Sequence, residues 1–227
     1  MKLVSVNVGL PRLLTWRGAT FKTGIFKTAV DGRIMLRTTN LDGDRQADLS
    51  VHGGPDKAVY SYPSERYLAW NAELPEPYAA RPRGAFGENF TTEGLLETAV
   101  SIGDRYRAGS AVIRVTTPRL PCFKLAAKFQ RDDILARFVR SGRCGFYFSV
   151  IEEGEVGPGD EFELLGRDEP TLRVAEVNRL YTGKSPDPES LQRSQHVKTL
   201  PKSWRERFRL DLRGASNSDI RLRRSGH

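Results

Sequence analysis

Short apolar runs alternate with turn residues along residues 1–170. The runs are rich in β-branched and aromatic side chains, and Asp-Gly or Gly-Asp pairs separate them, as is typical of strands joined by tight turns. The clearest predicted strands lie at 32–38, 58–62, 105–109, 110–117, 146–154 and 160–166. Short strands at such regular spacing predict a barrel or a strongly curled sheet.

Helical spacing interrupts the strand pattern twice. Ser64 precedes the run Glu65–Trp70 and can cap a helix that starts there. The second run, residues 131–141, places four apolar side chains at helical spacing. The predicted fold class is therefore mainly β, within the α+β group.

The pattern changes after Gly166, where three short helices are predicted. They cover residues 174–181, 188–197 and 201–212, and the second and third begin at prolines, which suit a first helical turn. The final residues, 216–227, are predicted to be frayed. We therefore expect a β-barrel domain at residues 1–168 and a three-helix domain with a basic tail at residues 169–227.

Composition sets the class of protein. The chain has 227 residues, of which 38% are hydrophobic, enough for one large core with a small appendage. No apolar run approaches the ~18–20 residues of a membrane-spanning helix. The first residues lack the apolar stretch and cleavage site of a signal peptide, so we expect a cytoplasmic protein without a membrane partner.

Positive charge is unevenly distributed. The net charge is +8, and residues 198–227 hold nine Lys or Arg residues against three acids. A basic surface attracts anions, which include nucleic acid and phosphate-bearing cofactors. Because most of the excess lies in the tail, the whole-chain charge is weak evidence for a nucleic-acid partner.

The segment Thr117–Leu125 contains the first candidate for chemistry, Cys122. Two prolines before it favour a stiff, extended approach. The cations Arg119 and Lys124 favour the thiolate, which is the nucleophilic form and a soft ligand for redox metals. On this segment alone, a buried structural thiol is an equal alternative. The other cysteine, Cys144, lacks these neighbours and is interpreted as structural.

A glycine-rich turn forms the second candidate segment. Gly53 and Gly54 let backbone amides approach and cradle an anion, and Lys57 adds a point charge. His52 can donate a hydrogen bond or move a proton near neutral pH. The alternative is a turn between two strands in which His52 only packs.

The third candidate segment contains Glu88, Asn89 and Thr91 among glycines. Carboxylate, amide and hydroxyl groups together suit hydrogen bonding to a polar heterocycle such as a pterin. The alternative is a capped loop. The chain has no Walker-type loop, GxGxxG, GxSxG or CxxC motif, so kinase, dehydrogenase and hydrolase functions lack support.

Taken in order, these segments resemble the MOSC domain, the fold of the C-terminal region of molybdenum-cofactor sulfurase. The matching motifs are HGGPDKAVY, GAFGENFTTEGL, PRLPCFKL and the ending GFYFSV…GEVGPGDEFELL. TGIFKTAV near the start and Leu200–Trp204 in the tail are similar to the YiiM-type branch, the 6-hydroxylaminopurine-resistance proteins. In that branch a three-helix domain follows the MOSC domain, so the resemblance covers nearly the whole chain.

The resemblance implies a β-barrel-like fold that binds the molybdenum cofactor, molybdopterin, with Cys122 as the ligand of the metal. It implies reduction of N–O bonds in N-hydroxylated bases, a detoxification in which His52 is a proton relay. The residues expected around the cofactor are Gly53, Gly54, Lys57, Glu88, Asn89, Thr91, Arg119 and Lys124.

The expected partners are an N-hydroxylated small molecule and a separate reductase, because the chain shows no flavin or iron–sulfur motif. An oligomer is left open. One alternative is a sulfur carrier with a persulfide on Cys122. Another is a non-catalytic binder, either of the cofactor or, through the basic tail, of nucleic acid. Metal analysis separates the molybdenum-dependent reductase from the sulfur carrier, and a steep loss of affinity with salt would mark a nucleic-acid binder.

Overall fold

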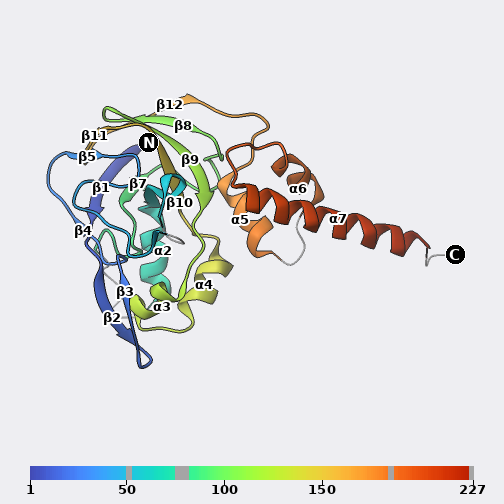
Figure 1. Cartoon of the computed structure of the whole chain (residues 1–227), viewed down its shortest axis with the longest axis horizontal. Coiled ribbons are helices and arrows are strands. Elements are labelled where there is room, and N and C mark those ends of the chain that lie inside the picture. Colours follow the sequence, from blue (N-terminus) through green and yellow to red (C-terminus); the bar gives the residue numbers. More distant parts are fainter. Residues whose placement is uncertain (50–52, 75–81, 184–186, 225–227) are drawn as a thin grey trace.

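One curled sheet of eight strands forms the body of the protein (Figure 1). The computed structural model describes residues 1–49, 53–74, 82–183 and 187–224, with side chains up to residue 214. The strand order is β12-β8-β9-β10-β6-β7-β1-β4. The strands are β1 (Lys2–Val8), β4 (Thr28–Ala29), β6 (Val59–Pro63), β7 (Phe90–Glu93), β8 (Arg105–Ala108), β9 (Ala111–Pro118), β10 (Phe146–Glu152) and β12 (Phe162–Gly166).

Backbone hydrogen bonds join β1 to the segment that enters β12, at the far end of the strand order. The Leu3 amide donates to the Asp160 carbonyl at 2.8 Å, and the Phe162 amide donates to the Met1 carbonyl at 2.9 Å. These bonds curl the sheet toward a closed barrel. The predicted class, mainly β within α+β, is confirmed.

Two further strand pairs lie outside this sheet. One is the hairpin of β2 (Arg12–Trp16) and β3 (Ala19–Thr23), which extends away from the barrel in Figure 1. The other pairs β5 (Ile34–Leu36) with β11 (Gly154–Val156). The Phe21 ring of the hairpin meets the Phe123 ring edge-on, with centroids 4.8 Å apart, and so anchors the hairpin on the body.

Within the described residues, three α-helices interrupt the sheet. The two predicted from spacing are present as α2 (Glu65–Glu73) and α4 (Ile134–Ser141). A third, α3 (Phe123–Phe129), was not among the predicted helices. It is only seven residues long, begins without a side-chain cap and ends at Gln130 in the left-handed conformation, so the usual boundary signals are absent from its sequence.

The tail forms the three predicted helices, α5 (Val174–Thr182), α6 (Pro188–Ser194) and α7 (Lys202–Arg224). The Asp187 carboxylate caps α6 by accepting from the Ser190 amide at 2.9 Å. The prediction that residues 216–227 are frayed is wrong up to Arg224, and residues 225–227 lie outside the described part. No proline stops α7 there, and its Leu and Arg residues favour a helix.

The helical tail is attached to the sheet by buried contacts. Val174 and Val177 of α5 are fully buried, and α5 packs against β9, whose residues are almost all buried for this reason. The predicted boundary at residues 168 and 169 falls between β12 and α5 and stays a prediction. None of the helices in the described ranges has the length and apolarity needed to cross a bilayer.

Candidate functional site

A pocket opens where three loops meet the sheet. Its walls come from residues 23–27, which begin at the last residue of β3, from residues 44–47, and from residues 119–124, which follow β9 and enter the first turn of α3. The sheet contributes Tyr60 from β6 and Tyr147 from β10. Cys122, which is partly exposed, lies in the wall of this pocket.

The chain reaches Cys122 in an extended conformation. β9 ends at Pro118, and Cys122 itself has φ −125° and ψ 169°, after which α3 begins. The Cys122 carbonyl accepts a hydrogen bond from the Leu125 amide at 2.9 Å. Cys122 itself is therefore extended, and its thiol lies in the pocket wall.

Positive charge dominates the pocket wall. Five of its described side chains are cations and one, Asp44, is an acid; the cations are Lys27, Arg45, Lys57, Arg119 and Lys124. Two of the walls come from stretches, 1–30 and 105–131, that contain no Asp or Glu. The pocket is therefore suited to an anionic ligand.

Arg119 is the most buried of the predicted cations, with 6% of its surface exposed. Its guanidinium lies 4.9 Å from the centre of the Tyr60 ring and 5.2 Å from that of Phe138. Its Nη1 atom is buried and has no hydrogen-bond partner among the described residues. Burial alone would lower the pKa of Arg119, but Tyr60 and other neighbours, including Cys122, outweigh it and the pKa is raised.

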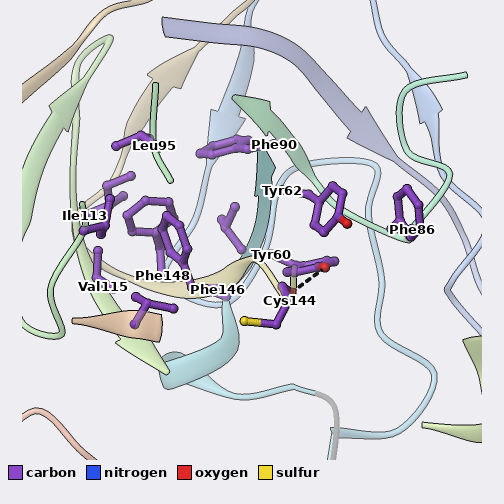
Figure 2. Close-up of a cluster of buried hydrophobic side chains, with 14 of the residues drawn as sticks. Tyr60, Tyr62, Phe86, Phe90, Leu95, Ile113, Val115, Cys144, Phe146 and Phe148 are labelled. Carbon is purple, nitrogen blue, oxygen red and sulfur yellow. Dashed lines mark hydrogen bonds between the residues drawn. The ribbon is translucent and has the colours of Figure 1, made fainter. Parts of the chain in front are cut away.

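Two tyrosines of the pocket were not predicted. Tyr60 and Tyr147 are cross-strand partners on β6 and β10, and their ring centroids lie 5.4 Å apart. The Tyr60 hydroxyl donates to the Cys144 carbonyl at 2.9 Å (Figure 2). Because the hydroxyl is engaged there, Tyr60 contributes its ring to the pocket lining. Pairing the two predicted strands at 58–62 and 146–154 would have brought these rings together, but the sequence does not give that register.

A buried ion pair holds the 44–47 wall in place. Lys27 Nζ lies 2.5 Å from Asp44 Oδ1, and their side chains are 7% and 1% exposed. Asn89 donates to the other Asp44 oxygen at 2.9 Å and also lines the pocket. Burial lowers the pKa of Lys27, while Asp44 opposes the shift. Lys27 and Asp44 were missed because nothing in the local sequence pairs these two residues or turns them toward the segment of Cys122.

Glu88 and Thr91, both predicted to contact the cofactor, are buried and do not line the described pocket. The Glu88 carboxylate accepts from the Gly84 amide at 2.8 Å, the Phe86 amide at 3.0 Å and the Thr91 hydroxyl at 3.1 Å, and also from the Tyr67 hydroxyl. Burial raises the pKa of Glu88. Glu88 therefore shapes the loop that carries Gly87 to the pocket.

Gly87 shows why this loop needs glycine. Its φ is +84°, and a Cβ there would lie 2.8 Å from Ile25 Cγ1 in the facing wall. A larger residue would strain the backbone and push the two walls apart. Gly87 thus allows the two walls of the pocket to approach each other closely.

The residues of the predicted glycine turn, 52–57, do not all lie at the pocket. Lys57, at the end of the 3₁₀ helix η1 (Pro55–Lys57), lines the pocket, and burial lowers its pKa against the opposing effect of Asp56. Gly53 is outside the described lining, and Gly54 lines a neighbouring hollow formed mainly by residues 39–46. His52 lies outside the described residues.

Cys144 has the environment of a structural thiol. It is 1% exposed and lies within the buried cluster of aromatic and aliphatic side chains drawn in Figure 2. Burial raises the pKa of its thiol well above the usual value. A thiol held in this way is neutral, which supports the interpretation of Cys144 as structural.

The sequence is similar to one known family and to several known proteins. The family model of the MOSC domain matches residues 48–163. YflK from Bacillus subtilis (strain 168) is 42% identical over 91% of this chain and 92% of its own. A protein from Gibberella moniliformis (strain M3125 / FGSC 7600) named "Reductase" is 36% identical over 74% of this chain, which corresponds to 30% of that protein.

A solved structure extends the similarity to the fold. The crystal structure of YiiM from Geobacillus stearothermophilus matches with a TM-score of 0.76 and 34% identity, over 93% of this chain and 98% of that one. Because nearly all of both chains is covered, the similarity includes the helical tail as well as the sheet.

Proposed function

Because the chain belongs to the MOSC domain family, we propose that it is a molybdenum-cofactor-dependent reductase of N-hydroxylated compounds, with Cys122 as the thiolate ligand of the metal. MOSC domains are associated with binding of this cofactor. The similarity to a protein named a reductase supports an oxidoreductase, although this chain covers only 30% of that protein.

The observation that carries the proposal is a thiol in the wall of a pocket surrounded by cations. A thiolate is a soft ligand that redox metals select. The unpartnered Nη1 atom of Arg119 marks a buried donor that the protein leaves available. A Cβ at Gly24 would lie 2.5 Å from the Arg45 carbonyl, so only glycine permits that wall. The residues present therefore fit a bulky anionic cofactor.

Each part of the cofactor has a suitable group in the pocket. Cys122 would hold the metal, and Lys57, Arg45 and Lys124 would bind the phosphate through charge-assisted hydrogen bonds. Asn89, already fixed by Asp44, would face the pterin. When bound, the cofactor supplies the two-electron chemistry, and the chain's own residues position it and tune the metal through the thiolate.

The proposed reaction converts an N-hydroxylated base into the corresponding amine. One N–O bond breaks, one N–H bond forms, two electrons and two protons are consumed, and one water leaves. The electrons come from a separate reductase, for which a basic surface suits an acidic partner. His52 is proposed to relay a proton.

The test is expression in cells with and without molybdenum-cofactor synthesis. Purified protein is analysed for molybdenum and for the fluorescence of oxidised pterin, and is then assayed with 6-hydroxylaminopurine and a chemical reductant. We expect metal, pterin and turnover only from cells that make the cofactor. A persulfide on Cys122 without molybdenum would instead show a sulfur carrier, and cofactor without turnover would show a carrier of the cofactor.

A further inference from the structure

Arg119 carries a buried positive charge that is not paired with a carboxylate among the described residues. It is 6% exposed. A guanidinium does not give up its proton in a protein, so the charge persists. The surrounding rings and Cys122 stabilise this charge, but the buried Nη1 donor has no hydrogen-bond partner among the described residues. An unsatisfied buried donor is costly, so its retention points to a ligand that accepts from it.

The orientation of this guanidinium is fixed before any ligand arrives. It is stacked against the rings of Tyr60 and Phe138, and the Arg119 backbone amide donates to the Gly145 carbonyl at 3.2 Å. A rigid donor in a site shielded from water is the arrangement that stabilises charge developing on an oxygen atom.

Arg119 also lies at the reacting end of the pocket. It lines the same pocket as Cys122, and the two groups interact electrostatically. The flexible ammonium groups of Lys57 and Lys124 suit a phosphate, which accepts point charges from several directions. The planar, buried guanidinium suits a single oxygen in a fixed place.

We propose that Arg119 is a catalytic residue that donates a hydrogen bond to the oxygen of the substrate's N–O group. This inference rests on the proposed function and assigns that oxygen a binding group. As the N–O bond breaks, negative charge grows on the oxygen, which keeps its own hydrogen, and Arg119 stabilises it until one proton releases it as water. The second proton forms the new N–H bond. The nitrogen is reduced by two electrons, which the separate reductase loses.

The kinetic test uses the cofactor-loaded enzyme with Arg119→Lys, which keeps the charge but loses the planar donor. We expect kcat for 6-hydroxylaminopurine to fall on the order of 100-fold, as when one such donor is lost elsewhere. The molybdenum and pterin content per chain should stay at the wild-type level. Arg143→Lys is the matched control, because Arg143 also stacks on a ring, that of Trp70, but lies outside the pocket lining.

The binding test uses cofactor-free protein. Sodium nitrate, a planar oxyanion, is compared with sodium chloride at equal ionic strength, and the thermal midpoint is measured. Nitrate should raise the midpoint of the wild type and leave that of Arg119→Met unchanged. Arg119→Met should itself be more stable than the wild type, whereas Arg143→Met should be less stable because it breaks the 2.6 Å ion pair with Glu73.

The outcomes separate the alternatives. Loss of molybdenum and pterin in step with activity would show that Arg119 holds the cofactor phosphate, and an unchanged kcat would show no catalytic role; either overturns the inference. A lower midpoint for Arg119→Met would show a structural arginine and overturn it too. If the wild type has neither cofactor nor turnover, the proposed function fails, and the nitrate and stability measurements alone decide whether Arg119 binds an oxyanion.

Discussion

At the scale of the residue, the two cysteines show how burial divides one side-chain type between two roles. Cys122 lies in the wall of a cationic pocket, whereas Cys144 is 1% exposed within the core. A thiol reacts as the thiolate and only when reagent reaches it. The two thiols should therefore differ in modification and in the effect of substitution.

We expect iodoacetamide to label Cys122 in the folded, cofactor-free protein and Cys144 only after unfolding. Cys122→Ala should abolish reduction of N-hydroxylated bases and retention of molybdenum while the protein stays folded. Cys144→Ala should keep the activity and lower the free energy of unfolding by about 1–2 kcal/mol through the cavity it leaves. Peptide mapping, metal analysis and urea unfolding measure these outcomes. Full activity in Cys122→Ala would refute the ligand assignment.

Lys128 provides a residue-scale prediction about pH. Its ammonium donates to the Ile25 carbonyl at 3.0 Å and to the Gly84 carbonyl at 2.9 Å, and burial lowers its pKa from 10.5 to about 7. Between these values the unfolded chain holds a proton on Lys128 that the folded chain has lost. The contribution of this group to stability therefore rises as pH increases from about 7 to about 10.5.

The measurement is the free energy of unfolding in urea at several pH values. The difference between the wild type and Lys128→Met should be constant below pH 6 and should shift in favour of the wild type from about pH 7 upward. Lys22→Met, at an exposed position of the hairpin, is the control and should keep the pH profile of the wild type. A flat difference for Lys128→Met would contradict the lowered pKa.

At the scale of the element, the β2–β3 hairpin supports a wall of the pocket. That wall begins at Thr23, the last residue of β3, and continues through residues 24 and 25. The hairpin rests on α3 through the contact of Phe21 with Phe123. The opposite face of the hairpin is exposed, and Leu13 there has 72% of its surface in solvent. The inner face should therefore matter for the site and the outer face should not.

We expect Phe21→Ala to lower the molybdenum content of the purified protein several-fold, because the wall next to Cys122 loosens. Its cost in stability should be small, about 1–2 kcal/mol, since the ring is only partly buried. Leu13→Ala is the matched control and should change neither quantity. Metal analysis and thermal unfolding test this, and equal metal content in both variants would show that the hairpin is dispensable for the site.

At the scale of the whole molecule, the sheet and the helical tail share one hydrophobic core. The buried cluster runs from Leu3 of β1 to Phe208 of α7 without a break. At the junction, Arg167 donates to both oxygens of Asp104, at 2.7 and 2.8 Å, and Asp104 is fully buried. The predicted domains at 1–168 and 169–227 are therefore joined by a shared core, and the Arg167–Asp104 pair lies within the first domain beside the boundary.

We expect a single cooperative unfolding transition in calorimetry, because neither part can unfold without exposing the shared core. Arg167→Ala should lower the free energy of unfolding by about 3 kcal/mol, since it leaves Asp104 buried without its cation. Arg107→Ala breaks only an exposed pair with Glu163 and should cost little. Two separate transitions in the wild type would show that the parts fold independently.

The sequence by itself determined the elements and the chemistry-bearing motifs. Alternating apolar residues and turn pairs identified the strands β8, β9 and β10, and the proline-led runs identified α6 and α7, because these signals are local. The same local signals failed for α3, which lacks caps, and for the end of α7. The cations that flank Cys122 were also evident in the sequence, since they lie within three residues of it.

Only the tertiary structure decided which residues meet. It brought Tyr60, Tyr147 and Asp44 to the pocket, and placed Glu88 and Thr91 in the network behind it. Strand register and burial depend on partners distant in sequence, so no local pattern encodes them. The thiol of Cys122, whose exposure the sequence left open, lies in the pocket wall because the loops after β3 and β9 fold against the same end of the sheet.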